Sequence, residues 1–118
     1  MLMRSLLRFS QLSRARQALV RLCQATNYGQ IQHLEITDGE PALSAAQLVL
    51  VELKLDSDEN PRPELHLADF DLCDEIHLMM ERLDAVHNGR IQRIEVRAGI
   101  PRRMVLESQF MSSEEVGR

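Results

Sequence analysis

The chain has 118 residues, which suits one compact domain that buries a core without metal or disulfide support. Hydrophobic residues make up 44%, charged residues 27% and the net charge is -4, as is typical of globular proteins. No uninterrupted apolar run approaches the ~20 residues that span a bilayer, which excludes a membrane-spanning helix. Aromatic residues are scarce at 3%, so the core must be aliphatic and base stacking on single-stranded nucleic acid is disfavoured.

The first predicted element is a helix. Apolar residues recur at three- and four-residue spacing over residues 12–22. The helix spans 2–26 or 11–26, and Ser10 is its N-cap if the chain breaks there. Gly29 follows at the position of a glycine that ends a helix.

A strand is predicted next, because apolar and polar side chains alternate over residues 30–37. Its core face carries Leu34 and Ile36. Its opposite face carries Ile31 and Glu35.

Turns follow this strand and its counterpart in the second half of the chain. The turn residues are Asp38-Gly39 in the first half and Ala98-Gly99 in the second. Because alanine resists positive φ, we expect type I turns closed by a left-handed glycine, rather than turns with two positive φ angles.

Residues 48–56 predict a second strand with apolar residues on both faces. Leu48 and Leu50 share one face with charged side chains, which favours cover by a partner chain or by the basic N-terminal segment. The apolar residues expected on the other face are Val49, Val51, Leu53 and Leu55.

An acidic loop with prolines, residues 57–68, separates this strand from the second half. Asp69 is positioned to cap a second helix over residues 70–87. Strands over 90–97 and 102–108 complete the order helix-strand-strand, repeated once.

The second half repeats the first. Residues 29–41 read GQIQHLEITDGEP, and residues 89–101 read GRIQRIEVRAGIP, with six of thirteen positions identical. We therefore predict a single α+β domain made of two repeats, 10–56 and 69–108, joined by the acidic loop. Neither unit buries enough alone, so they pack as a four-stranded antiparallel sheet with both helices on one face, around a pseudo-twofold axis.

The repeated block G-x-I-Q-x-L-E-I-x-x-G-x-P, the N-P-R-P-E loop at residues 60–64 and the L-A-D-F that follows resemble a small uncharacterised bacterial protein family. The likeness covers residues 19–107. Asn60 is followed directly by Pro61, where the family places a glycine between them, so the loop differs in shape. The resemblance implies a cytoplasmic bacterial protein and carries no catalytic residue across.

Charge is segregated along the chain. Residues 1–34 carry five arginines and no acid, whereas residues 35–88 carry fourteen acids and three bases. A basic segment of this kind binds nucleic acid, or it docks on the acidic middle of its own chain or of a second copy. It also fits an organelle presequence, although it occupies the helix position that the repeat requires. The arginines of the nucleic-acid alternative are Arg4, Arg8, Arg14, Arg16 and Arg21.

The two cysteines, Cys23 and Cys73, are predicted to be free thiols packed on helices in a reducing compartment. Cys73 and His77 are four residues apart, a spacing that can ligate metal, and Cys23, His33 and His66 could join them. No second paired motif supports such a site, so no metal and no other cofactor is predicted.

One enzymatic alternative rests on Glu35 and Glu95, which hold equivalent strand positions. If the pseudo-twofold axis brought them together, one carboxyl would have a raised pKa and could do acid–base work. No phosphate loop, nucleophile elbow or other catalytic motif is present, so no catalytic residue is predicted.

The predicted function is therefore a non-enzymatic protein-interaction or self-association module, acting as a homodimer or with another protein through its sheet face or edge. Nucleic-acid binding or regulation through the N-terminal arginines is the alternative. The residues predicted for the sheet face are Ile31, Glu35, Leu48, Leu50, Ile91, Arg93, Glu95 and Arg97.

Overall fold

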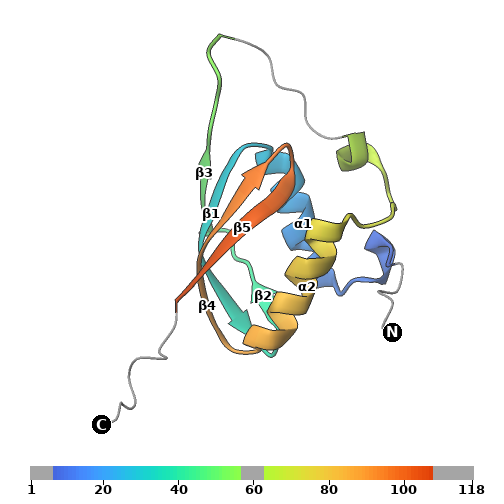
Figure 1. Cartoon of the computed structure of the whole chain (residues 1–118), viewed down its shortest axis with the longest axis vertical. Helices are drawn as coiled ribbons and strands as arrows, with labels where there is room; N and C mark the ends of the chain where they lie inside the picture. The colour runs from blue at the N-terminus through green and yellow to red at the C-terminus, as the bar shows by residue number, and fades with distance from the viewer. Residues whose placement is uncertain (1–6, 57–62, 108–118) are drawn as a thin grey trace.

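The computed structural model describes residues 7–56 and 63–107. Two helices lie on one face of an antiparallel sheet with strand order β2-β1-β4-β5, and β3 also pairs with β1 (Figure 1). The predicted α+β fold is confirmed. The elements are η1 (Phe9–Gln11), α1 (Arg14–Thr26), β1 (Gly29–Thr37), β2 (Glu40–Ala42), β3 (Leu48–Val51), η2 (Pro63–His66), α2 (Asp74–Val86), β4 (Gly89–Arg97) and β5 (Ile100–Glu107).

The two halves are related by a pseudo-twofold axis between β1 and β4. Ile31 pairs with Ile94, and Leu34 pairs with Ile91. A shift of sixty residues turns one of these pairs into the other, so the two central strands meet as equivalents. The side chains of all four residues are fully buried under the helices.

Each hairpin turn is bonded to the helix of the other half. The Gly39 N–H donates to the carbonyl oxygen of His87 at 2.6 Å, and the Gly99 N–H donates to that of Asn27 at 2.8 Å. Both acceptors end a helix with φ near +60° and ψ near -60°, about the geometry of the strained γ-turn. Strain of this kind persists where the surrounding structure fixes it, and here the opposite hairpin does so.

The turn type differs from the prediction. Asp38 and Gly39 have φ of 53° and 78°, and Ala98 and Gly99 have φ of 53° and 76°. Both two-residue loops are therefore type I′, with two positive φ angles. The prediction was wrong because the twist of a tight hairpin favours this turn strongly enough to place an alanine in the left-handed region.

The predicted orientation of Ile31 and Ile91 was also wrong, because both side chains point into the core rather than onto the outer sheet face. The β1–β4 ladder passes from the Gln32–Arg93 pair directly to the pair of Leu34 with Ile91. One residue of each strand is left unpaired at this level, and His33 takes a φ of 57°. Such an irregularity reverses the alternation of side chains.

Element boundaries differ at several places: β5 begins at Ile100 rather than at residue 102, and β2 was not predicted as a strand. Helix α1 is capped by Ser13 rather than Ser10. The Ser13 hydroxyl accepts a hydrogen bond from the Arg16 N–H at 3.2 Å. Helix α2 begins at Asp74, so Asp69 is not its cap. Strand β3 ends at Val51, short of the predicted end at residue 56.

Candidate interaction surface

The outer edge of the first half differs from that of the second. Strand β5 follows β4 along its length, whereas in the first half the chain leaves the sheet between β2 and β3. Glu35 pairs with Ala42 and Gln32 with Leu48, so three steps along β1 correspond to six along its partner. The three additional residues make β3 a separate strand at the edge.

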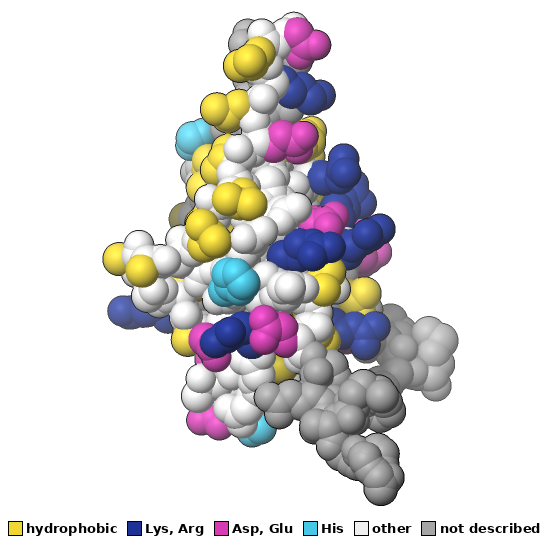
Figure 2. Space-filling model, turned by 90° about the vertical axis from the view of Figure 1, so that its left-hand side faces the viewer, with side chains coloured by type: hydrophobic (Ala, Val, Ile, Leu, Met, Phe, Trp, Pro, Cys, Tyr) yellow, Lys and Arg dark blue, Asp and Glu magenta, His cyan; other side chains and the backbone are white. Residues whose placement is uncertain are grey.

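Residues 48–56, which we call the β3 arm, expose a row of apolar side chains. Leu48 and Leu50 are 44% and 47% exposed, and Leu53 and Leu55 reach 75% and 98%. The arm runs away from the body of the molecule after β3 (Figure 1). In the space-filling view, hydrophobic side chains form a file from the tip of the molecule down onto the sheet face (Figure 2).

The exposure of the inward-facing arm residues was missed by the sequence prediction. Val49 packs against the core, but Val51 on the same face is 54% exposed, and Leu53 and Leu55 follow it. Strand β1 begins at Gly29, and Gly29 pairs with Val51. Because the two strands are antiparallel, the later residues of the arm extend past the first residue of β1. The length of β1 was the available signal: its last three residues pair with β2, so its nine residues cannot also pair with the whole predicted strand of nine residues.

Across the open sheet face, the composition changes from apolar at β3 to charged at β4 and β5. Leu50, Gln30, Glu95 and Arg103 are successive cross-strand partners in one row. Six of the eight residues predicted for this face lie on it, and the exceptions are Ile31 and Ile91. The six are Glu35, Leu48, Leu50, Arg93, Glu95 and Arg97. Figure 2 shows the basic side chains gathered beside the apolar file.

Glu35 and Glu95 do not meet. Glu95 pairs with Gln30 and Glu35 with Arg90, so the two carboxylates lie five positions apart along the ladder, about 17 Å. The Arg90 Nε donates to Glu35 at 2.5 Å, and this hydrogen bond and the carboxylate charge raise the pKa of Arg90. The proposed carboxylate pair is absent, because the pseudo-twofold axis places the equivalent residues at opposite ends of the ladder.

Three of the N-terminal arginines bind the chain's own acidic groups and carbonyls, and these are Arg8, Arg16 and Arg21. Arg8 contacts Asp69 at 2.8 Å and Asp71 at 2.7 Å, and Arg16 contacts Asp84 at 2.5 Å. These contacts support the internal docking alternative over nucleic-acid binding.

Arg21 also contacts groups of its own chain. Its guanidinium lies 4.1 Å from the ring centre of Phe9 and donates to the Glu64 carbonyl at 2.9 Å. Arg14 is exposed, and Arg4 lies outside the described residues.

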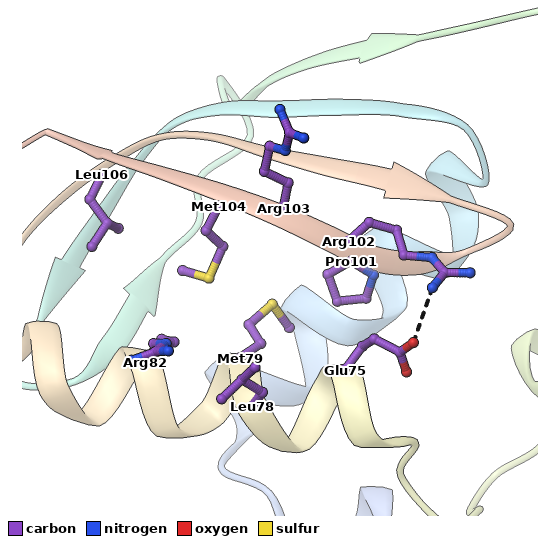
Figure 3. A pocket seen from close by; sticks show the side chains of 9 residues that line it. All are labelled: Glu75, Leu78, Met79, Arg82, Pro101, Arg102, Arg103, Met104 and Leu106. Atoms are coloured by element: carbon purple, nitrogen blue, oxygen red, sulfur yellow. Dashed lines mark hydrogen bonds and ion pairs between the residues drawn. The ribbon is translucent and has the colours of Figure 1, made fainter.

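A concave site lies between α2 and β5 (Figure 3). This cavity of about 220 Å³ is lined mainly by apolar side chains, and Arg102 closes one end by an ion pair with Glu75 at 3.1 Å. Arg103 points away from the helix in this view. The apolar lining is Leu78, Met79, Pro101, Met104 and Leu106. The walls suit an apolar side chain and carry no nucleophile–base pair.

The described cysteines are free thiols. Cys23 is fully buried, and desolvation raises its pKa to about 12, so it stays protonated at neutral pH. Burial also raises the pKa of Cys73. Within residues 7–56 and 63–107, no three His, Cys, Asp or Glu side chains gather closely enough to hold a metal ion.

Helices α1 and α2 have 13 residues each, and no helix in the described part of the chain is long and apolar enough to cross a membrane. No protein-family model, curated protein or solved structure matches the chain. The family resemblance of the repeated motif therefore stays a prediction.

Proposed function

We propose that the chain is a non-enzymatic protein-interaction module that binds its partner along the β3 arm. The observation that supports this proposal is the run of exposed leucines along the β3 arm, which begins on a strand whose outer edge has no neighbour among the described strands. An apolar, unpaired edge strand promotes aggregation unless another chain covers it.

The remainder of the surface supports an interaction role rather than a catalytic one. The two candidate carboxylates are separated, and three N-terminal arginines are occupied within the chain. Strand β1 is held in the sheet by β4, and β3 pairs with the opposite edge of β1. We place the module in the bacterial cytoplasm, a proposal supported by the family resemblance and by two cysteines that are free of a disulfide.

Photo-crosslinking tests this function in the cells from which the chain comes. A photoreactive residue replaces Leu53, which is 75% exposed, so the fold should be unaffected. We expect a discrete protein adduct from position 53. Position 37, an exposed threonine on β1 outside the arm, serves as the control. Equal, background-level labelling at both positions would contradict the proposal.

A further inference from the structure

We propose that the occupant of the β3 arm is the same arm of a second copy, paired antiparallel about a twofold axis through Leu53. This inference rests on the proposed function and names its partner. It joins two sheets edge to edge, with the two β3 arms at the centre of the dimer.

The backbone at the outer edge is oriented for this pairing. The Glu52 N–H donates to the Tyr28 carbonyl oxygen at 2.7 Å, so the peptide groups of Glu52 face β1. Because these groups alternate along a strand, those of Val51 face the open edge, and those of Leu53 would face it once pairing with the partner extends β3. The edge therefore presents donors and acceptors at the residues nearest the proposed axis.

Symmetry restricts the possible registers. A twofold axis normal to the sheet keeps each residue on its own face, and directly opposite residues share a face. The axis must therefore pass through a residue. The charges within the β3 arm are those of Glu52, Lys54 and Asp56, so these three side chains discriminate among the registers.

An axis through Leu53 sets Glu52 opposite the partner's Lys54, and Lys54 opposite the partner's Glu52. An axis through Glu52 or through Lys54 would set like charges against each other, which is unfavourable. An axis through Leu55 would set Lys54 opposite the partner's Asp56, but it would pair only residues 54–56 of the described arm. Glu52 and the partner's Lys54 would form a non-hydrogen-bonded pair, in which side chains approach most closely. Lys54 also lies 5.9 Å from the centre of the Tyr28 ring, and its three donors allow both contacts.

The same register brings the exposed apolar residues together. Leu53 lies opposite the Leu53 of the partner, and Val51 lies opposite the partner's Leu55. These three residues are 54% to 98% exposed in the single chain. Pairing therefore removes apolar surface from water on one face while the two ion pairs form on the other.

Charge reversal tests the partner and the register together. Sedimentation equilibrium should show a dimer for the wild type, and Glu52→Lys or Lys54→Glu should raise the dimer dissociation constant about tenfold or more, because each puts two like-charge pairs in place. The double variant Glu52→Lys/Lys54→Glu should restore dimerisation, since it exchanges the charges within the same pairs. Glu81→Lys and Arg82→Glu on α2 are matched controls that should leave the dimer intact.

A disulfide provides a second measurement. Leu53→Cys in a Cys73→Ser background should form a covalent dimer on mild oxidation, since opposite residues of a hydrogen-bonded pair have Cα atoms about 5.5 Å apart. Thr37→Cys should not. Circular dichroism checks that every variant is folded.

The outcomes separate this inference from the proposed function. A wild type that stays monomeric at high micromolar concentration overturns the self-pairing, while crosslinks from position 53 to a different protein would still support the interaction module. A dimer that the double reversal fails to restore overturns the register through Leu53.

Discussion

At the residue scale, Ala98 and Asp38 hold the same place in two type I′ turns but tolerate it unequally. Both have φ of 53°. The left-handed region costs most residues about 1–2 kcal/mol, and Asn and Asp, whose side chains bond locally, adopt it more readily. The second turn therefore keeps a strain that the first relieves, so a better turn residue should stabilise the protein.

We predict that Ala98→Asn raises the free energy of unfolding by about 1 kcal/mol, because Asn-Gly is the preferred type I′ pair. Urea denaturation measures this change. Asp38→Asn is the matched control and should have little effect. A loss of stability in the Ala98 variant would contradict the turn geometry described for this hairpin.

At the scale of elements, the sequence predicted which segments form strands better than where their side chains point. In β1 the buried residues Ile31, Leu34 and Ile36 are spaced three and then two apart, and β4 repeats this spacing. Regular alternation cannot bury all three side chains. Burial of the apolar side chains is retained instead, and each strand leaves one residue unpaired. The presence of the same spacing in both halves was the available signal for this irregularity.

The boundary of β3 could not be predicted from its own residues, because residues 48–56 alternate as a strand throughout. The ladder ends where β1 begins, and this limit is a property of the partner strand. The separation of Glu35 from Glu95 likewise depends on the register about the pseudo-twofold axis, which the repeat alone leaves open.

The pairing of β3 with β1 depends on Gly29. A Cβ at Gly29 would collide with the carbonyl oxygen of Leu50, whereas at the equivalent Gly89 its nearest contact would be a Val86 methyl at 3.3 Å. We predict that Gly29→Ala costs about 1–3 kcal/mol of stability and displaces β3.

Gly89→Ala should be milder, because a methyl group yields more easily than backbone. Thermal unfolding compares the two variants, and hydrogen exchange of the Glu52 amide reports on the position of β3. Equal losses in the two variants would contradict the close approach of β3 at Gly29.

At the scale of the whole molecule, an ion pair ties the N-terminal segment to the chain before α2. Asp69 accepts hydrogen bonds from the Arg8 side chain and from the Ser10 N–H, both at 2.8 Å. The Arg8 hydrogen bond, followed by that of Ser10, lowers the pKa of Asp69 from 3.8 to about 2. The unfolded state then binds more protons between these two pH values, so the stabilisation is complete above about pH 4 and is lost as the pH falls toward 2.

We therefore predict that Asp69→Asn flattens the acid side of the stability profile between about pH 4 and 2. Arg8→Gln should do the same, because it removes the main cause of the lowered pKa. Melting temperatures measured across this range test both variants, and exchange of the Ser10 amide gives a local readout. A wild-type slope that survives in both variants would assign the acid sensitivity to other carboxylates.

The reciprocal bonds between hairpin turns and helix ends have a consequence for how the two halves could evolve. Gly39 and Gly99 donate, and His87 and Asn27 accept, through main-chain atoms alone. Such a joint tolerates replacement of most side chains around it, so duplicated halves can diverge while their mutual fit is inherited unchanged. The three additional residues beside β3 illustrate this freedom: the first half carries a protruding strand that the second lacks, while the hydrogen bonds between the halves are equivalent on both sides.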